Sequence, residues 1–154
     1  MRKLLIGVGL AFALLFAALQ AIPYGRNHAN PPTTLEPAWD SPATREFAVR
    51  ACFDCHSNQT TWPWYSNLAP ASWLVQRDVD EGRSKLNFSE WDRPQEEPWE
   101  SVEAVAEGEM PPRSYLFLHS PARLTPEEIR AFVQGLRATL GGNLEGEESL
   151  LRNR

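Results

Sequence analysis

The stretch Ala51-Cys52-Phe53-Asp54-Cys55-His56-Ser57 contains both cysteines of the 154-residue chain and one of its three histidines. The thiols are separated by two residues and the imidazole follows directly, so one tight helical turn carries all three groups. Two cysteines this close cannot staple distant segments together, and a disulfide between them would be a reactive one. The motif therefore predicts chemistry rather than a structural cross-link.

The Cys-x-x-Cys-His pattern is typical of covalent haem attachment. Both thiols would form thioethers with the haem vinyl groups, and His56 would bind the iron from one side. Two alternatives are a dithiol exchange pair and a zinc site, although the motif supplies only three zinc ligands and no second cluster follows. We therefore predict one haem c, bound covalently by Cys52 and Cys55 and ligated by His56.

The second axial ligand has few candidates in the rest of the chain. Met110 is the only methionine besides Met1, and His119 is the only histidine of the predicted domain besides His56. Met110 lies in Glu109-Met110-Pro111-Pro112, where two prolines would rigidify the loop that carries the sulfur. Met110 is the predicted sixth ligand, and His119 or an open site are the alternatives.

The N-terminus predicts a membrane anchor. Residues 4–22 form 19 consecutive positions without a charge, close to the roughly 20 residues of a transmembrane helix and longer than the 7–15 apolar residues typical of a signal peptide. Arg2 and Lys3 precede this run and predict a cytoplasmic N-terminus. Residues 1–22 are thus expected to anchor the protein in the cytoplasmic membrane, uncleaved, with the rest of the chain on the exported side.

Four prolines between residues 23 and 39 predict a stiff stalk that holds the domain away from the bilayer. Residues 40–141 are expected to form the haem-binding domain, and residues 142–154 a flexible tail. Capping residues and apolar periodicity predict four helices in the domain. They run from Pro42, with Ser41 as its cap, to the cysteines, from Pro70 to Gly82, from Pro98 to Gly108 and from Pro126 to Gly141.

The last of these helices has the clearest signature. Thr125 and Glu128 form a capping box, and an apolar stripe follows at helical spacing. The stripe consists of Ile129, Phe132, Val133, Leu136 and Leu140. No segment alternates apolar and polar residues long enough for a strand, so the domain is predicted to be all-α.

Aromatic residues are concentrated between the cysteines and Met110. We expect them to surround a large flat cofactor, with an ordinary core as the alternative. They are Trp62, Trp64, Tyr65, Trp73, Phe88, Trp91 and Trp99.

The charge of the chain bears on its partners. Without Arg2 and Lys3, 13 Lys and Arg stand against 20 Asp and Glu, a net charge of −7. This excess of negative charge disfavours nucleic acid as a partner. It predicts a redox partner with a basic surface.

Three stretches resemble the bacterial haem-binding domain family, over about residues 40–140. They are CFDCHSNQTTWPWYSNLAPASWLV from Cys52, EGRSKLNFSEW from Glu81 and EMPPRSYLFLHSPARLT from Glu109. The resemblance implies a single covalent haem c, an all-α body similar to class I cytochromes c, and Met110 as the distal ligand. The family often has histidine where this chain has Asp78, a departure that removes one possible ligand.

These features predict a membrane-anchored monohaem cytochrome that transfers single electrons. Histidine and methionine together would leave the iron no vacant position for substrate chemistry, which favours a carrier over an enzyme. One alternative is a haem-based sensor or peroxidase-like enzyme, with a displaceable sixth ligand and His119 or Arg123 nearby. Another is a haem-bearing subunit of a larger membrane complex.

Overall fold

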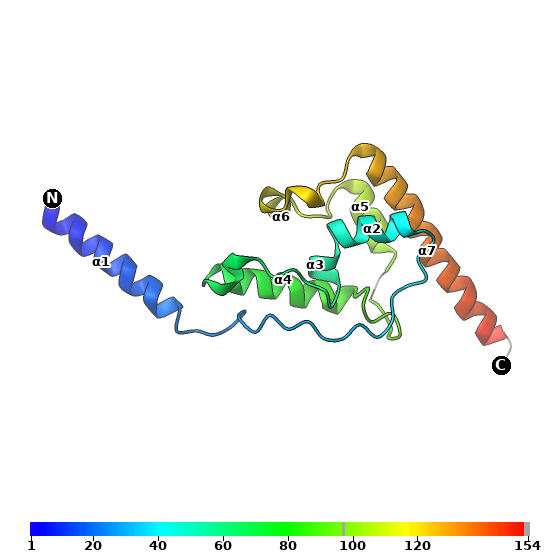
Figure 1. Ribbon diagram of the computed structural model, residues 1–154, viewed down its shortest axis with the longest axis horizontal. Helices are drawn as coiled ribbons and strands as arrows, with labels where there is room; N and C mark the ends of the chain where they lie inside the picture. Colours follow the sequence, from blue (N-terminus) through cyan, green and yellow to red (C-terminus); the bar gives the residue numbers. More distant parts are fainter. Residues whose placement is uncertain (97, 153–154) are drawn as a thin grey trace.

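The protein is built from helices. The computed structural model describes residues 1–96 and 98–152, with side chains up to residue 141, and these residues form no strand (Figure 1). This confirms the predicted all-α class with an N-terminal apolar helix. The elements are α1 (Arg2–Leu19), α2 (Pro42–Ala51), α3 (Phe53–His56), the 3-10 helix η1 (Trp64–Asn67), α4 (Ala71–Lys85), α5 (Glu100–Glu107), α6 (Arg113–Leu118), the 3-10 helix η2 (Ser120–Ala122) and α7 (Pro126–Arg152).

The capping signals read from the sequence are present at two helix starts. Ser41 Oγ accepts a hydrogen bond from the Thr44 amide at 3.2 Å, with Pro42 in the first turn of α2. At α7, the Thr125 amide donates to the Glu128 carboxylate at 2.7 Å, and the Glu128 amide donates to Thr125 Oγ1 at 3.2 Å. Both predicted helix starts are therefore confirmed.

One hydrophobic core joins α2, α3, α5 and α7. The predicted stripe of α7 faces this core, with Phe132 and Leu136 fully buried. Val102 and Val105 of α5 pack into it. The core holds α5 over the cysteine motif.

Two predicted helix ends are wrong. α4 continues past Gly82 to Lys85, and α7 continues past Gly141 to Arg152. Glycine ends a helix when its backbone turns left-handed, as Gly108 does at the end of α5 with φ of 74°. Gly82 and Gly141 keep a helical backbone instead, so they are interior residues.

The segment after α1 lies along the domain. We call residues 20–39 the strap. The Thr34 amide donates to the Ser89 carbonyl at 2.9 Å, the Trp91 amide to the Leu35 carbonyl at 2.9 Å, and the Asn30 side chain to the Thr60 carbonyl at 2.9 Å. Hydrogen bonds therefore attach the strap to the body, whereas the proline content predicted a free-standing stalk.

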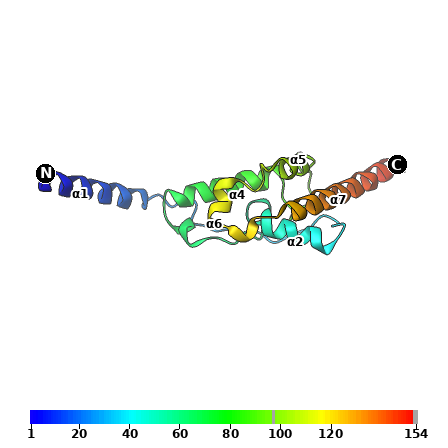
Figure 2. The same cartoon turned by 90° about the horizontal axis from the view of Figure 1, so that it is seen from above.

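Helix α1 projects from one end of the molecule, and α7 extends from the other (Figures 1 and 2). Helix α1 ends at Leu19, three residues before the predicted end of the apolar run, and none of its side chains is buried. Its 18 residues are long and apolar enough to cross a membrane. At 1.5 Å per residue they span about 27 Å.

Candidate functional site

The cysteine motif is a single helical turn between α2 and α4. The amides of Cys55 and His56 both donate to the Cys52 carbonyl, at 3.1 and 2.8 Å. Residues four apart on a helical turn share a face, so Cys52 and His56 lie next to each other. Gly82 of α4 packs on this turn so closely that a methyl group there would lie 2.5 Å from the Cys55 carbonyl oxygen.

His56 is held in one orientation by a backbone carbonyl. Its Nδ1 lies 3.1 Å from the Leu86 oxygen. A carbonyl only accepts, so Nδ1 carries the proton, and the lone pair of the neutral ring lies on Nε2. Burial lowers the pKa of His56, which favours this neutral form. The ring is thus prepared to ligate a metal through Nε2.

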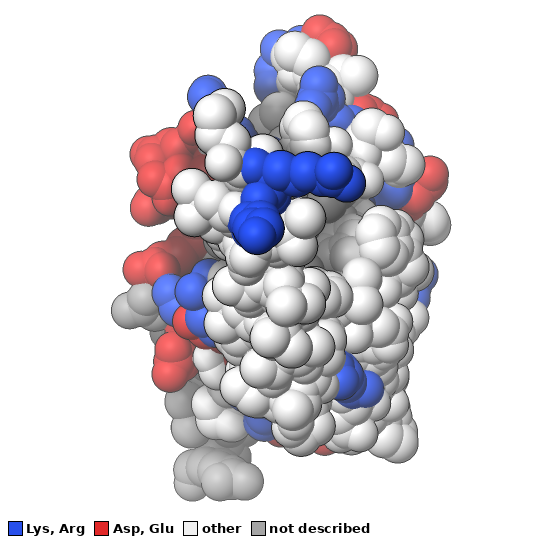
Figure 3. Space-filling view, turned by 90° about the vertical axis from the view of Figure 1, so that its left-hand side faces the viewer, with Lys and Arg blue, Asp and Glu red and all other residues white. Residues whose placement is uncertain are grey.

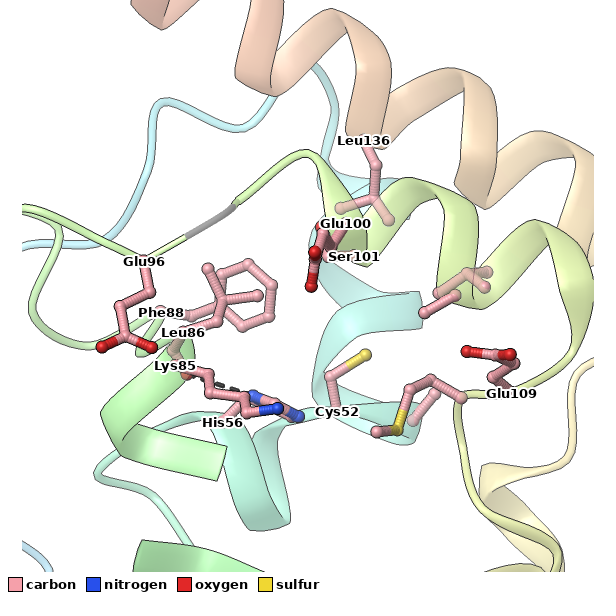
Figure 4. Close-up of a pocket in the computed structure, with 14 residues that line it drawn as sticks. Cys52, His56, Lys85, Leu86, Phe88, Glu96, Glu100, Ser101, Glu109 and Leu136 are labelled. Atoms are coloured by element: carbon pink, nitrogen blue, oxygen red, sulfur yellow. Dashed lines mark hydrogen bonds between the residues drawn. The ribbon is translucent and has the colours of Figure 1, made fainter. Parts of the chain in front are cut away.

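Cys52 and His56 line a cavity of about 380 Å³ between the motif, α5 and α7 (Figure 4). This volume lies within the range of small-molecule and cofactor sites. Its apolar wall is formed by Ala51, Leu86, Phe88, Ala104, Val105 and Leu136. Lys85, Glu96, Glu100, Ser101 and Glu109 add polar groups, with Glu96 and Glu109 at opposite ends of the view.

Met110 also lines the cavity, from the loop after α5. The left-handed Gly108 ends the helix, and the amides of Glu109 and Met110 then both donate to the Ala104 carbonyl, at 2.9 and 3.0 Å. Met110 remains 40% exposed, although it borders an apolar cavity. The structure therefore brings three of the four predicted site residues, Cys52, His56 and Met110, to one cavity.

A family model for a haem-binding domain matches residues 14–138. The chain belongs to the haem-binding domain family. The match extends beyond the predicted domain into the strap and the second half of α1. No curated protein and no solved structure matches the chain.

The residues at the cavity fit a haem. A flat apolar macrocycle needs an apolar enclosure, and the iron needs a donor atom, which His56 Nε2 can supply. Both cysteines are free thiols, and burial raises the pKa of Cys52 to about 12 and that of Cys55 to about 11. A dithiol exchange pair relies on a thiol of lowered pKa, so the cysteines of this haem-binding domain do not match that alternative.

Several residues expected at the haem lie elsewhere. Cys55 does not line the cavity in this structure, and neither do His119 and Arg123. His119 stacks on Tyr115 with ring centroids 4.0 Å apart, and its Nε2 lies 3.3 Å from the Tyr65 hydroxyl. The polar groups invoked for a sensor or enzyme are therefore not at the cavity.

Most of the aromatic residues that were predicted to surround the cofactor do not line the cavity. Of the seven aromatic residues, only Phe88 lines the cavity. Trp64 is 76% exposed, and Trp91 stacks on Phe88 from the side of the core. Phe53 also stacks on Phe88, and Trp39 packs against it at a tilt; the sequence singled out neither residue for the core. The aromatic residues mainly build the core and the surface.

Sequence reasoning missed two groups that organise the site. The Leu86 carbonyl had no signal, because every residue has one. Tyr115 donates a 2.7 Å hydrogen bond to the carboxylate of Asp54, inside the cysteine motif. Burial and this carboxylate raise the pKa of Tyr115, so the hydroxyl remains a donor. The hydrogen bond connects α6, which directly follows the Met110 loop, to the cysteine motif. The position of Tyr115 five residues after Met110 is the sequence feature that could have indicated this contact.

Proposed function

We propose that this protein is a membrane-anchored c-type cytochrome that holds one haem and transfers single electrons on the exported side of the cytoplasmic membrane. The observation that carries the proposal is the shared cavity of Cys52, His56 and Met110. A proximal histidine beside a thiol and a methionine sulfur on the neighbouring loop are the groups that a His-Met haem c requires.

Each residue has a defined task in this proposal. Cys52 and Cys55 would hold the haem through thioethers, and His56 Nε2 and the Met110 sulfur would ligate its iron. Haem bound in this way supplies a one-electron couple between ferric and ferrous iron. The Leu86 carbonyl accepts a hydrogen bond from the Nδ1–H of His56, which fixes the ring and makes Nε2 a stronger donor.

The apolar lining favours an electron carrier. Phe88, Leu136 and Val105 would give the haem an apolar surrounding on one side, which disfavours the more highly charged ferric state. Methionine ligation acts in the same direction, since it also raises the reduction potential. The acidic body then favours a redox partner with a basic surface, through steering over long range.

Membrane anchoring is supported by α1. The helix is apolar, unburied and long enough to span. Arg2 and Lys3 at its start favour a cytoplasmic N-terminus, and the cavity would then lie on the exported side. An anchored carrier meets membrane-bound partners at a raised effective concentration.

The absorption spectrum of the full chain, purified with its haem, tests this proposal. Haem is expected to stay with the polypeptide after acid-acetone extraction and to be lost from the Cys52→Ser/Cys55→Ser double variant. Haem released from the parent chain would disprove covalent attachment while leaving haem binding intact.

The axial ligand is tested with a matched pair of variants. The methionine-to-iron charge-transfer band of the oxidised protein is expected to disappear in Met110→Ala and to persist in His119→Ala. Retention of the band in Met110→Ala would remove Met110 as the ligand. Rapid carbon monoxide binding by the reduced parent protein would favour a sensor or enzyme over a carrier.

A further inference from the structure

Four apolar side chains are exposed at the end of the domain from which α1 departs. Trp64 is 76% exposed, Leu68 41%, Phe117 85% and Leu118 60%. They come from η1, the residue after it, and the end of α6. In both ribbon views α6 and the start of α4 lie toward α1 (Figures 1 and 2). We call these four residues the apolar end.

The two halves of the apolar end are neighbours in space. The Tyr65 hydroxyl lies 3.3 Å from Nε2 of His119, and these two residues directly follow Trp64 and Leu118 in the chain. Trp64 and Tyr65 also meet edge to face, with ring centroids 5.8 Å apart. The exposed residues of η1 and α6 thus belong to one surface.

Charged residues are missing from the segments that form this surface. The chain has no Asp, Glu, Lys or Arg from Ser57 to Gln76, nor from Ser114 to Leu118. In the view from the side of α1, uncharged atoms fill most of the visible surface, with the apolar helix α1 itself in front of the domain (Figure 3). A face of this kind, with tryptophan and phenylalanine at its tip, is typical of a membrane–water interface.

The exit of α1 is fastened to the same surface. The Gln20 amide group pairs with the backbone of Ala69, next to Leu68: Nε2 donates to the Ala69 carbonyl at 2.9 Å, and the Ala69 amide donates to Oε1 at 3.1 Å. Arg26 donates to both Gln20 oxygens, at 2.9 and 2.8 Å. The first residue after the proposed membrane helix therefore lies beside the apolar end.

We propose that the apolar end lies against the bilayer that α1 crosses, with Trp64 and Phe117 in the boundary between headgroups and acyl chains. The inference rests on the proposed membrane anchoring. Lipid is the proposed partner because Gln20 holds the end of the membrane helix next to Leu68. The bilayer surface that α1 leaves is therefore the apolar medium nearest to the apolar end. The domain would then sit directly on the membrane, in agreement with a strap that is attached to the body along its length.

Photo-crosslinking of the full chain in lipid nanodiscs tests this. The photoreactive residue p-benzoylphenylalanine replaces Phe117, Trp64 or, as control, Trp99. Trp99 is also an exposed aromatic residue, 41% exposed, but it lies beside Gly141 of α7, away from α1. Lipid adducts are measured by mass spectrometry, after the haem content and circular dichroism of each variant have been matched.

Adduct yields at positions 117 and 64 are expected to exceed the yield at 99 on the order of ten-fold, since interfacial groups penetrate ~5–10 Å into the bilayer boundary. Equal yields at all three positions would overturn the proposal. So would adducts at 117 and 64 that join a second copy or another protein instead of lipid. Alkaline carbonate extraction distinguishes membrane anchoring by α1 from contact of the apolar end with the bilayer. Release of the full chain from the membrane would overturn the anchoring. A chain that stays in the membrane but forms no lipid adducts would overturn only the contact of the apolar end.

Discussion

Replacing Gly82 with alanine is expected to destabilise the domain, although alanine is the better helix former. The new methyl group would lie 2.5 Å from the Cys55 carbonyl oxygen and 2.9 Å from its carbon, and both are backbone atoms of the motif turn. Overpacking of this kind costs roughly 1–3 kcal/mol, and the gain in helix propensity returns about 0.5–1 kcal/mol. The midpoints of these two ranges leave a net loss of about 1 kcal/mol, or a lowering of Tm by roughly 2–4 °C in a chain of this size.

Gly141→Ala is the matched control. Gly141 also lies inside a helix, but its nearest neighbour would be Trp99 at 4.0 Å, so alanine fits there without strain. This variant is expected to gain about 0.5–1 kcal/mol. Urea unfolding of the full chain in detergent micelles, followed by tryptophan fluorescence, measures both changes. A Gly82→Ala protein as stable as Gly141→Ala would refute the close contact between α4 and the motif turn.

Three further predictions concern contacts around the site. Arg83→Met is expected to weaken the attachment of the strap to the body by about 2 kcal/mol, because the guanidinium donates to four oxygens of the strap and of the loop after the motif. Limited proteolysis should then cut the Arg83→Met protein within residues 23–39 faster than the Arg83→Lys protein. Tyr115→Phe should cost about 1–2 kcal/mol in thermal unfolding, since it removes the bond to Asp54, and an unchanged Tm would contradict this. The hydrogen bonds and charge of Arg45 lower the pKa of Glu36, so ionised Glu36 stabilises the folded state. This stabilisation is complete above the ordinary glutamate pKa and is lost as the pH falls through the lower, folded-state pKa. Curves of unfolding free energy against pH for the parent and Glu36→Gln should therefore converge in acid, and parallel curves would contradict the pairing.

Local patterns in the sequence predicted the parts of the fold that depend on near neighbours. Ser41 and the Thr125–Glu128 pair cap helices through contacts three residues away, so their signals are complete in the sequence. The cysteine motif is equally local, and the family match supports the haem binding that it predicted. The cavity also holds Met110, which was chosen because other ligands are scarce.

The failed predictions depend on contacts between distant segments. Whether Gly82 ends a helix or packs inside one is decided by the motif turn, 27 positions earlier in the chain. The aromatic residues have the composition of a haem pocket, but tertiary packing sends Trp64 to the surface and Trp91 to the core. The strap has the proline content of a spacer, and its binding to the body follows from backbone groups that carry no sequence signal.

The strap also sets the limits of the folding unit. Asn58 is buried, and its side chain donates to the Pro32 carbonyl at 3.2 Å. A fragment that begins at residue 40 would lose this acceptor, the Leu35 carbonyl opposite Trp91, and two of the oxygens that hold Arg83. Groups buried without partners cost roughly 1–3 kcal/mol each. The smallest soluble form that keeps the domain whole therefore begins close to residue 20, directly after α1, and not where the first helix of the body starts.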